Sequence, residues 1–201
     1  MSDLNATITS RTSPSGISTL NTSMTSNTSH MRYAQINKLD ISNGSGVGIA
    51  LFTAGCPIHC HNCFNSNLWS MDAGMPFTEE TKITLLDLLR PEYIRRISIL
   101  GGEPLIERNK SKLLDLIQSI RELYGDSKKI WLYTGRVYED AIDAYSDIIG
   151  RVDILVDGPF VDELKDASLD WRGSSNQRVI DIRKTRECGD IVIYENKYRV
   201  D

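Results

Sequence analysis

Short apolar runs alternate with longer segments of helical periodicity, and this alternation constrains the fold more than any other feature of the chain. The apolar runs are predicted strands at 47–53, 97–100, 130–133 and 152–156. Helices are predicted between them, one starting after Thr78 and stopping before Pro91, and two more at 109–124 and 138–149. Strand–helix–strand units fold as right-handed crossovers, so the sequence predicts an α/β protein with a parallel sheet.

The length of the chain limits how far such a sheet can close. A closed eight-stranded β/α barrel typically takes about 250 residues, whereas this chain has 201. We therefore expect an open sheet or a partial parallel β/α barrel. Two later apolar runs, 178–182 and 190–194, are predicted as further strands that could pair with each other.

Residues 1–30 differ in composition from the rest of the chain. They are rich in Ser, Thr and Asn, have little charge, and show no apolar periodicity. Such a segment cannot bury enough apolar surface to offset the entropy lost on ordering. We therefore expect a disordered tail over 1–30 and one folded domain over 31–201.

Charge and hydropathy exclude several classes of protein. The net charge of −4 argues against a broad basic surface for nucleic acid. No apolar run approaches the roughly 20 residues that cross a bilayer, and the N-terminus lacks the pattern of a secretory signal. Three of the four cysteines fall within eight positions, which is unlike a disulfide framework. We expect a metal site in a reducing compartment, the cytoplasm, and neither a nucleic-acid nor a membrane partner.

Polar or glycine-rich loops follow each of the predicted parallel strands. They are the cysteine loop and the segments 101–103, 134–135 and 157–158. Because parallel strands end at the same edge of a sheet, these loops should meet there and form the functional site.

The cysteines have the spacing C-x3-C-x2-C, at Cys56, Cys60 and Cys63. One interpretation is a structural zinc site whose fourth ligand is His59, His61 or Cys188. Such sites usually come as paired knuckles, however, and the sequence has no second C-x-x-C. The other interpretation is a four-iron four-sulfur cluster that leaves one iron open for a ligand, which suits three thiolates better.

The cysteine spacing after the first predicted strand, together with Gly-Gly-Glu-Pro after the second, resembles the radical S-adenosylmethionine superfamily. The resemblance implies that the open iron binds S-adenosylmethionine and that reductive cleavage gives a 5′-deoxyadenosyl radical. The loop also makes chemical sense without the resemblance. Gly101 and Gly102 let backbone approach a ligand closely, and Glu103 can accept hydrogen bonds from an ammonium group.

One branch of that superfamily resembles the chain more closely, namely the activating proteins of anaerobic ribonucleoside-triphosphate reductase. Asn62 stands before the third cysteine, where most of the superfamily has an aromatic residue, and Phe64-Asn65 follows it. The segments 156–160 and 171–178 also fit this branch. The resemblance implies a cofactor site made of Asn62, Phe64, Gly101, Gly102, Glu103 and Asp157. For Asp157, a turn carboxylate that caps backbone amides is the alternative.

The resemblance implies an activating enzyme, a radical S-adenosylmethionine oxidoreductase that generates a glycyl radical on the reductase. Its expected partners are that reductase and a one-electron donor such as flavodoxin. No side chain is expected to act as an acid or base, because the protein positions cofactors that carry the chemistry. Two alternatives stay open: another short radical enzyme acting on a small molecule, such as a deazapurine-forming synthase, or a zinc-binding interaction module without catalysis.

Overall fold

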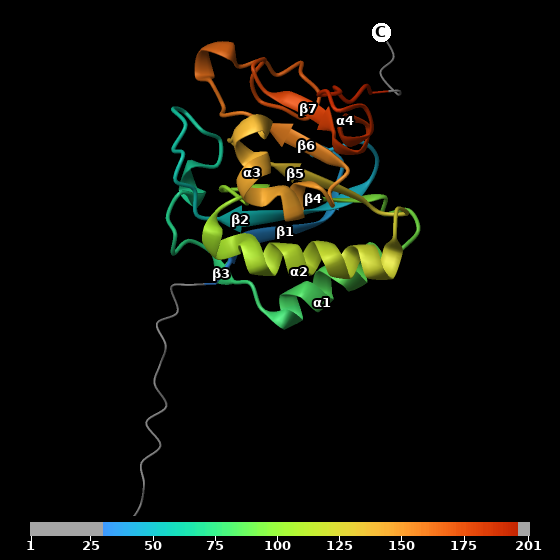
Figure 1. Cartoon of the computed structure of the whole chain (residues 1–201). Coiled ribbons are helices and arrows are strands. Elements are labelled where there is room, and N and C mark those ends of the chain that lie inside the picture. The colour runs from blue at the N-terminus through green and yellow to red at the C-terminus, as the bar shows by residue number, and fades with distance from the viewer. Residues whose placement is uncertain (1–29, 197–201) are drawn as a thin grey trace, which may run out of the picture.

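A seven-stranded sheet forms the centre of the computed structural model, which describes residues 30–196 (Figure 1). The strands are β1 (Arg32–Asp40), β2 (Gly48–Ala54), β3 (Met75–Pro76), β4 (Arg96–Gly101), β5 (Lys129–Tyr133), β6 (Ile154–Asp157) and β7 (Arg178–Asp181). They lie in the order β3-β1-β2-β4-β5-β6-β7. The tail expected over 1–30 falls outside the described residues, apart from its last position.

The central strands β2, β4, β5 and β6 run parallel, as the sequence predicts. The flanking pairs are antiparallel: β1 with β2 and β3, and β7 with β6. Parallel neighbours need a long crossover, usually an α-helix, and the chain reaches these flanking strands without one. The sheet is therefore open, as expected, but mixed: the expected parallel order holds for its four central strands and not for its edge strands.

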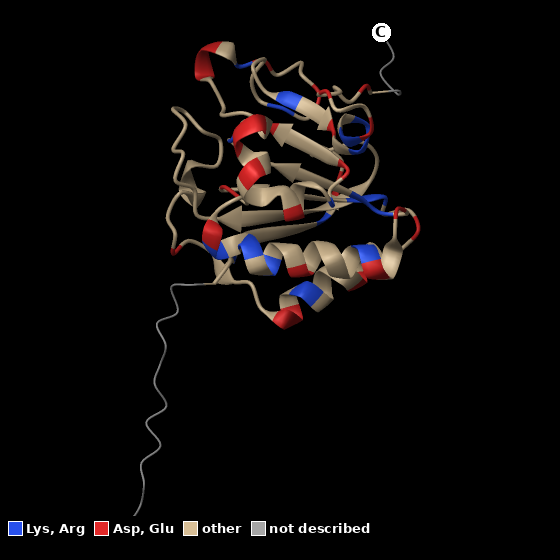
Figure 2. Ribbon diagram, viewed as in Figure 1, with Lys and Arg blue, Asp and Glu red and all other residues tan. Residues whose placement is uncertain are grey.

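Three helices cover one face of the sheet, close to where the sequence predicts them: α1 (Glu79–Leu89), α2 (Glu107–Tyr124) and α3 (Tyr138–Ile149) (Figure 1). Strand residues such as Ile49, Ile97 and Ile130 pack against the helices in the main core. Each helix carries acidic residues in its first turn, where their negative charge interacts favourably with the positive end of the helix dipole (Figure 2). None of the described helices is long and apolar enough to cross a membrane.

Loops cover the opposite face of the sheet, over a smaller aromatic cluster. Trp131 of β5 packs edge-on against Trp171 and Tyr194, with ring centroids 5.0 and 5.4 Å apart. Trp171 belongs to the connection between β6 and β7, and Tyr194 follows α4 (Ile182–Cys188). A face covered by irregular segments leaves room for a cavity, which the helix-covered face does not.

The segment 190–194 differs from its prediction. It follows α4 and forms no regular strand, since only Ile193 makes an antiparallel bridge, to Ile180 of β7. The expected strand over 190–194 is therefore wrong, whereas its expected pairing with the 178–182 segment is confirmed.

Candidate metal and cofactor site

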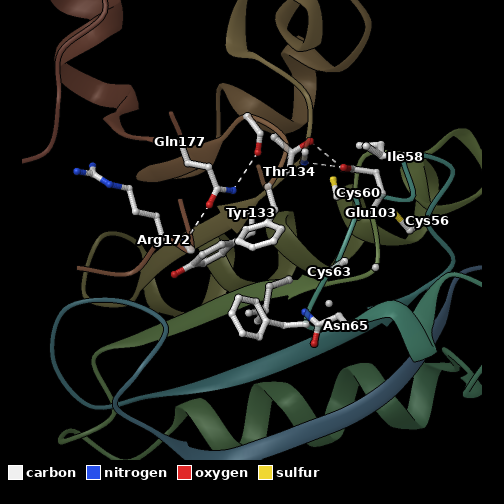
Figure 3. A pocket seen from close by; sticks show the side chains of 18 of the residues that line it. Cys56, Ile58, Cys60, Cys63, Asn65, Glu103, Tyr133, Thr134, Arg172 and Gln177 are labelled. Carbon is white, nitrogen blue, oxygen red and sulfur yellow. Dashed lines mark hydrogen bonds between the residues drawn. The ribbon is translucent and has the colours of Figure 1, made fainter. Parts of the chain in front are cut away.

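A cavity of about 460 Å³ opens at the carboxyl ends of the parallel strands, on the face that the loops cover (Figure 3). Its wall includes the three clustered cysteines, the 101–103 loop, residues 133–135 and Gly158. The expectation that the strand-end loops meet at one edge is thus confirmed. A volume of this size suits a small-molecule cofactor, since ligand pockets commonly span about 300–1,000 Å³.

Backbone contacts hold the cysteine loop against the end of β4. The Gly55 N–H donates to the Leu68 carbonyl at 2.8 Å, and the Gly55 carbonyl accepts from the Glu103 N–H at 2.8 Å. A Cβ on Gly102 would lie 2.5 Å from the Gly55 carbonyl oxygen, so this approach requires glycine. The loop that carries the cysteines and the loop that carries Glu103 therefore form one unit.

Cys56, Cys60 and Cys63 are half-buried free thiols that border the same cavity. Burial raises the pKa of Cys56 and of Cys60, and backbone hydrogen bonds to their sulfurs partly oppose this rise. Within the described part of the chain, no three His, Cys, Asp or Glu side chains are already grouped so that they could hold a metal ion. Three thiols that line one cavity, with backbone donors at two sulfurs, are nonetheless a donor set that fits a thiolate-bound iron–sulfur cluster.

Cys188 lies apart from this site. It is exposed at the end of α4, and its thiol donates to the Asp190 carbonyl at 3.3 Å. It does not line the cavity. This position gives no support to the alternative in which Cys188 is a fourth ligand.

Three polar residues beside the cysteines do not line the cavity. His59 stacks on Trp69 with ring centroids 4.6 Å apart, and His61 is exposed. Asn62 has a left-handed backbone with φ of 54°, and its side-chain amide donates to Asp162 at 2.6 Å. Asparagine tolerates this conformation better than most residues, so a tight turn accounts for Asn62 without a cofactor contact.

Glu103 is a buried carboxylate without an ion-pair partner among the described residues. It is 1% exposed, and it accepts hydrogen bonds of 2.8 Å from the Thr134 hydroxyl and from the backbone N–H groups of Leu105 and Gly135 (Figure 3). Burial raises the pKa of Glu103, because these neutral donors compensate only part of the lost hydration. A cation in the cavity would complete this environment, so the site fits an ammonium group.

The two remaining predicted residues, Phe64 and Asp157, have different positions. Phe64 lines the cavity with a ring that is 67% exposed, and it packs edge-on against Phe160 at 5.4 Å. Asp157 is fully buried outside this cavity. Its carboxylate accepts from the Tyr138 N–H at 2.7 Å and pairs with Arg178, which matches the alternative of a capping carboxylate.

Four apolar or aromatic residues that line the cavity were not predicted from the sequence. Phe52, Leu100 and Tyr133 line it from β2, β4 and β5, and Trp171 lines it from the segment before β7. The signal that could have found them is the alternation along each strand, since Tyr133 projects to the same face as Trp131. In strands this short, the alternation of side chains between the two faces covers too few positions to be recognised in the sequence.

Comparison with known proteins gives two concordant results. A family model described as a 4Fe-4S single cluster domain matches residues 42–180. Three curated proteins named "Anaerobic ribonucleoside-triphosphate reductase-activating protein" are similar over most of the chain. The one from Escherichia coli (strain K12) is 40% identical over 156 residues, covering 76% of this chain and 100% of that protein. Those from Vibrio cholerae and Enterobacteria phage T4 are 36% and 34% identical over 149 residues, covering 73% and 74% of this chain and 96% and 93% of theirs.

Proposed function

The chain belongs to the family of anaerobic ribonucleoside-triphosphate reductase-activating proteins, and on this premise we propose how its cavity works. It is an activating enzyme that contains an iron–sulfur cluster. Its target is the anaerobic ribonucleoside-triphosphate reductase that the names of its relatives specify. On that reductase it generates a glycyl radical, as the resemblance of its motifs implies.

In the proposed site, Cys56, Cys60 and Cys63 ligate a four-iron four-sulfur cluster and leave one iron open. This ligand set is supported by the position of all three around one cavity, which Cys188 does not line. Backbone hydrogen bonds at Cys56 and Cys60 would stabilise the thiolates once iron has replaced their protons.

S-adenosylmethionine binds beside the open iron, with its ammonium group at Glu103. The observation that carries this assignment is the buried Glu103 carboxylate, which faces the cavity with hydrogen bonds but without an ion pair. Gly101 and Gly102 bring backbone close to the ligand, and Phe64 packs against it from the open side. Bound together, the cluster and S-adenosylmethionine supply one-electron chemistry that removes a hydrogen atom from a glycine of the reductase.

In this proposal, the chain's own side chains orient the cofactors and enclose the cavity. Thr134 and Gly135 fix the Glu103 carboxylate through two hydrogen bonds. Asn62 and Asp157 hold the turn before Cys63 and the start of α3, and neither is assigned a cofactor contact. The open sheet with a loop-covered face supports a partial barrel, and the free thiols suit the reducing cytoplasm, where flavodoxin could serve as the electron donor.

Anaerobic reconstitution with iron and sulfide tests the proposed function. After reduction, the brown protein should cleave S-adenosylmethionine to methionine and 5′-deoxyadenosine, and should leave a glycyl radical on added reductase. Changing any one of Cys56, Cys60 and Cys63 to Ala should abolish both outcomes, whereas Cys188→Ala should retain them. The electron paramagnetic resonance spectrum and product chromatography provide the readouts.

Three results would contradict the proposal. A colourless protein that holds zinc instead of iron would favour the interaction module. Loss of activity in Cys188→Ala, with the other three cysteines intact, would overturn the ligand set. Rapid turnover of a free metabolite, with no radical on the reductase, would favour a small-molecule enzyme.

A further inference from the structure

The cavity has a lower wall that the proposed cofactor contacts do not use. Thr53 pairs with Gly101 at the ends of β2 and β4, and the pair of Phe52 with Leu100 lies one position deeper. Tyr133, the last residue of β5, lines the cavity at that level. In Figure 3, Tyr133 lies across the cavity from Cys56 and Cys60. We call Phe52, Leu100 and Tyr133 the lower wall.

The Tyr133 hydroxyl is the polar group of this lower wall. Its oxygen is buried and has no hydrogen-bond partner among the described residues. Burial raises the pKa of Tyr133, so the phenol keeps its proton and remains a donor. A buried hydroxyl without a partner is unfavourable in the free protein, and an acceptor on a ligand would remove that penalty.

Two polar side chains near this wall, those of Gln177 and Asn43, are already used within the protein, whereas Arg172 Nε and Trp69 Nε1 elsewhere around the cavity are buried without a partner among the described residues. Gln177 accepts from the Gly173 N–H at 2.9 Å and donates to the Gly158 carbonyl at 3.0 Å. The Asn43 amide donates to Asp40 at 2.8 Å. The lower wall therefore offers a hydroxyl donor in a mainly apolar surface.

The chemistry of this wall favours a peptide backbone over a nucleoside. An adenosine carries several donors and acceptors, more than the one hydroxyl of the lower wall can satisfy. A peptide segment presents one carbonyl per residue, and a glycine adds no side chain to be accommodated. The other substrate of the proposed reaction is a polypeptide with a target glycine, and it must reach the same cavity.

We propose that Tyr133 is a substrate-binding residue whose hydroxyl donates a hydrogen bond to a backbone carbonyl of the reductase segment that carries the target glycine. This inference rests on the proposed function. The largely exposed ring of Phe64 marks the open side of the cavity, from which such a segment enters. The role of Tyr133 is recognition of the protein substrate, distinct from retention of the cluster or of S-adenosylmethionine.

Tyr133→Phe tests this inference, because it keeps the ring and removes the hydroxyl. The KM for reductase in glycyl-radical formation should rise by roughly 5- to 10-fold, as expected for loss of one neutral hydrogen bond. The Kd for S-adenosylmethionine and the iron content should stay at the wild-type values. Tyr194→Phe is the matched control, because Tyr194 packs on Trp131 and Trp171 on the same face but does not line the cavity.

Folding of the variant can be checked separately. Since the hydroxyl makes no internal hydrogen bond, Tyr133→Phe should unfold no earlier than the wild type in a thermal melt. An unchanged KM for reductase would overturn the inference. A weaker Kd for S-adenosylmethionine that accounts for the whole loss would also overturn it, by making Tyr133 a cofactor contact. A wild-type protein that carries the cluster but forms no radical would instead overturn the proposed function.

Discussion

Glu103 has an environment unlike that of the other buried carboxylates described above. Asp40 pairs with Arg96 at 2.7 Å, and Asp157 pairs with Arg178 at 2.5 Å. Glu103 accepts hydrogen bonds from neutral donors instead, and the charge of Arg136 only partly offsets the effect of its burial. Because a buried charge is costly unless it is paired, a cation bound in the cavity would stabilise the Glu103 carboxylate.

Replacing Glu103 with Gln should weaken S-adenosylmethionine binding by about 10- to 100-fold, because a hydrogen bond to a charged group contributes about 1.5–3 kcal/mol. Anaerobic equilibrium binding to cluster-loaded protein measures the change. Glu107→Gln, in the exposed first turn of α2, is the control and should bind normally. Wild-type affinity in Glu103→Gln would rule out the ammonium contact.

For single residues, the sequence predicted which chemical groups reach the site better than it predicted the direction of their side chains. The three cysteines and Glu103 line one cavity because their loops all follow parallel strands, and that order can be read along the chain. The direction of a side chain depends on contacts distant in sequence. Asn62 bonds to Asp162, 100 positions away, so spacing alone could not show that it turns from the cavity.

At the scale of elements, helices and strands with strong local sequence signals were predicted, whereas those with weak signals were missed. α1 begins where expected because Thr78 and Thr81 form a reciprocal capping box. β1 escaped prediction because most of its residues are only half-buried, which leaves no clean alternation. α4 spans seven residues and buries only Ile182 and Thr185, too few for a helical period to emerge.

Arg178 joins β7 to two neighbouring elements, through Asp157 at the end of β6 and Glu139 in the first turn of α3. Its hydrogen bonds lower the pKa of Glu139 to about 2. Asp157 itself is fully buried, so it depends on Arg178 to balance its charge. The network should therefore stabilise the junction of the three elements.

Arg178→Met should lower the free energy of unfolding by about 3 kcal/mol, because it leaves the buried Asp157 carboxylate without its cation. Arg183→Met is the matched control: it removes the exposed pair with Glu187 and should leave the free energy of unfolding nearly unchanged. Urea titration measures both changes. Equal stability of the two variants would mean that the Asp157 pair contributes no more than a surface pair.

At the scale of the whole molecule, the two faces of the sheet have separate tasks. Helices α1 to α3 pack over the larger apolar core, whereas loops enclose the cavity on the other face. The length of the chain already predicted an open sheet. The antiparallel edge strands could not be predicted in the same way. They are joined to their neighbours by loops, so they lack the strand–helix–strand pattern that indicates parallel strands.

Removing the cluster should loosen the loop face without unfolding the helix face. Limited proteolysis of the iron-free protein should cut first within 56–66 and 159–177, where the chain is held mainly by loop contacts. The cluster-loaded protein should resist cutting there, because a bound group stabilises the folded state. Mass spectrometry locates the cuts, and circular dichroism follows the helices. Loss of the helical signal on iron removal would contradict this separation.

The contact of Gly102 with the Gly55 carbonyl has a consequence for how such a protein can change over generations. Because one loop carries the thiols and the other carries the buried carboxylate, neither can drift in sequence or length without displacing its neighbour. In the proposed site, the cluster ligands and the carboxylate that receives the ammonium group would thus be inherited together.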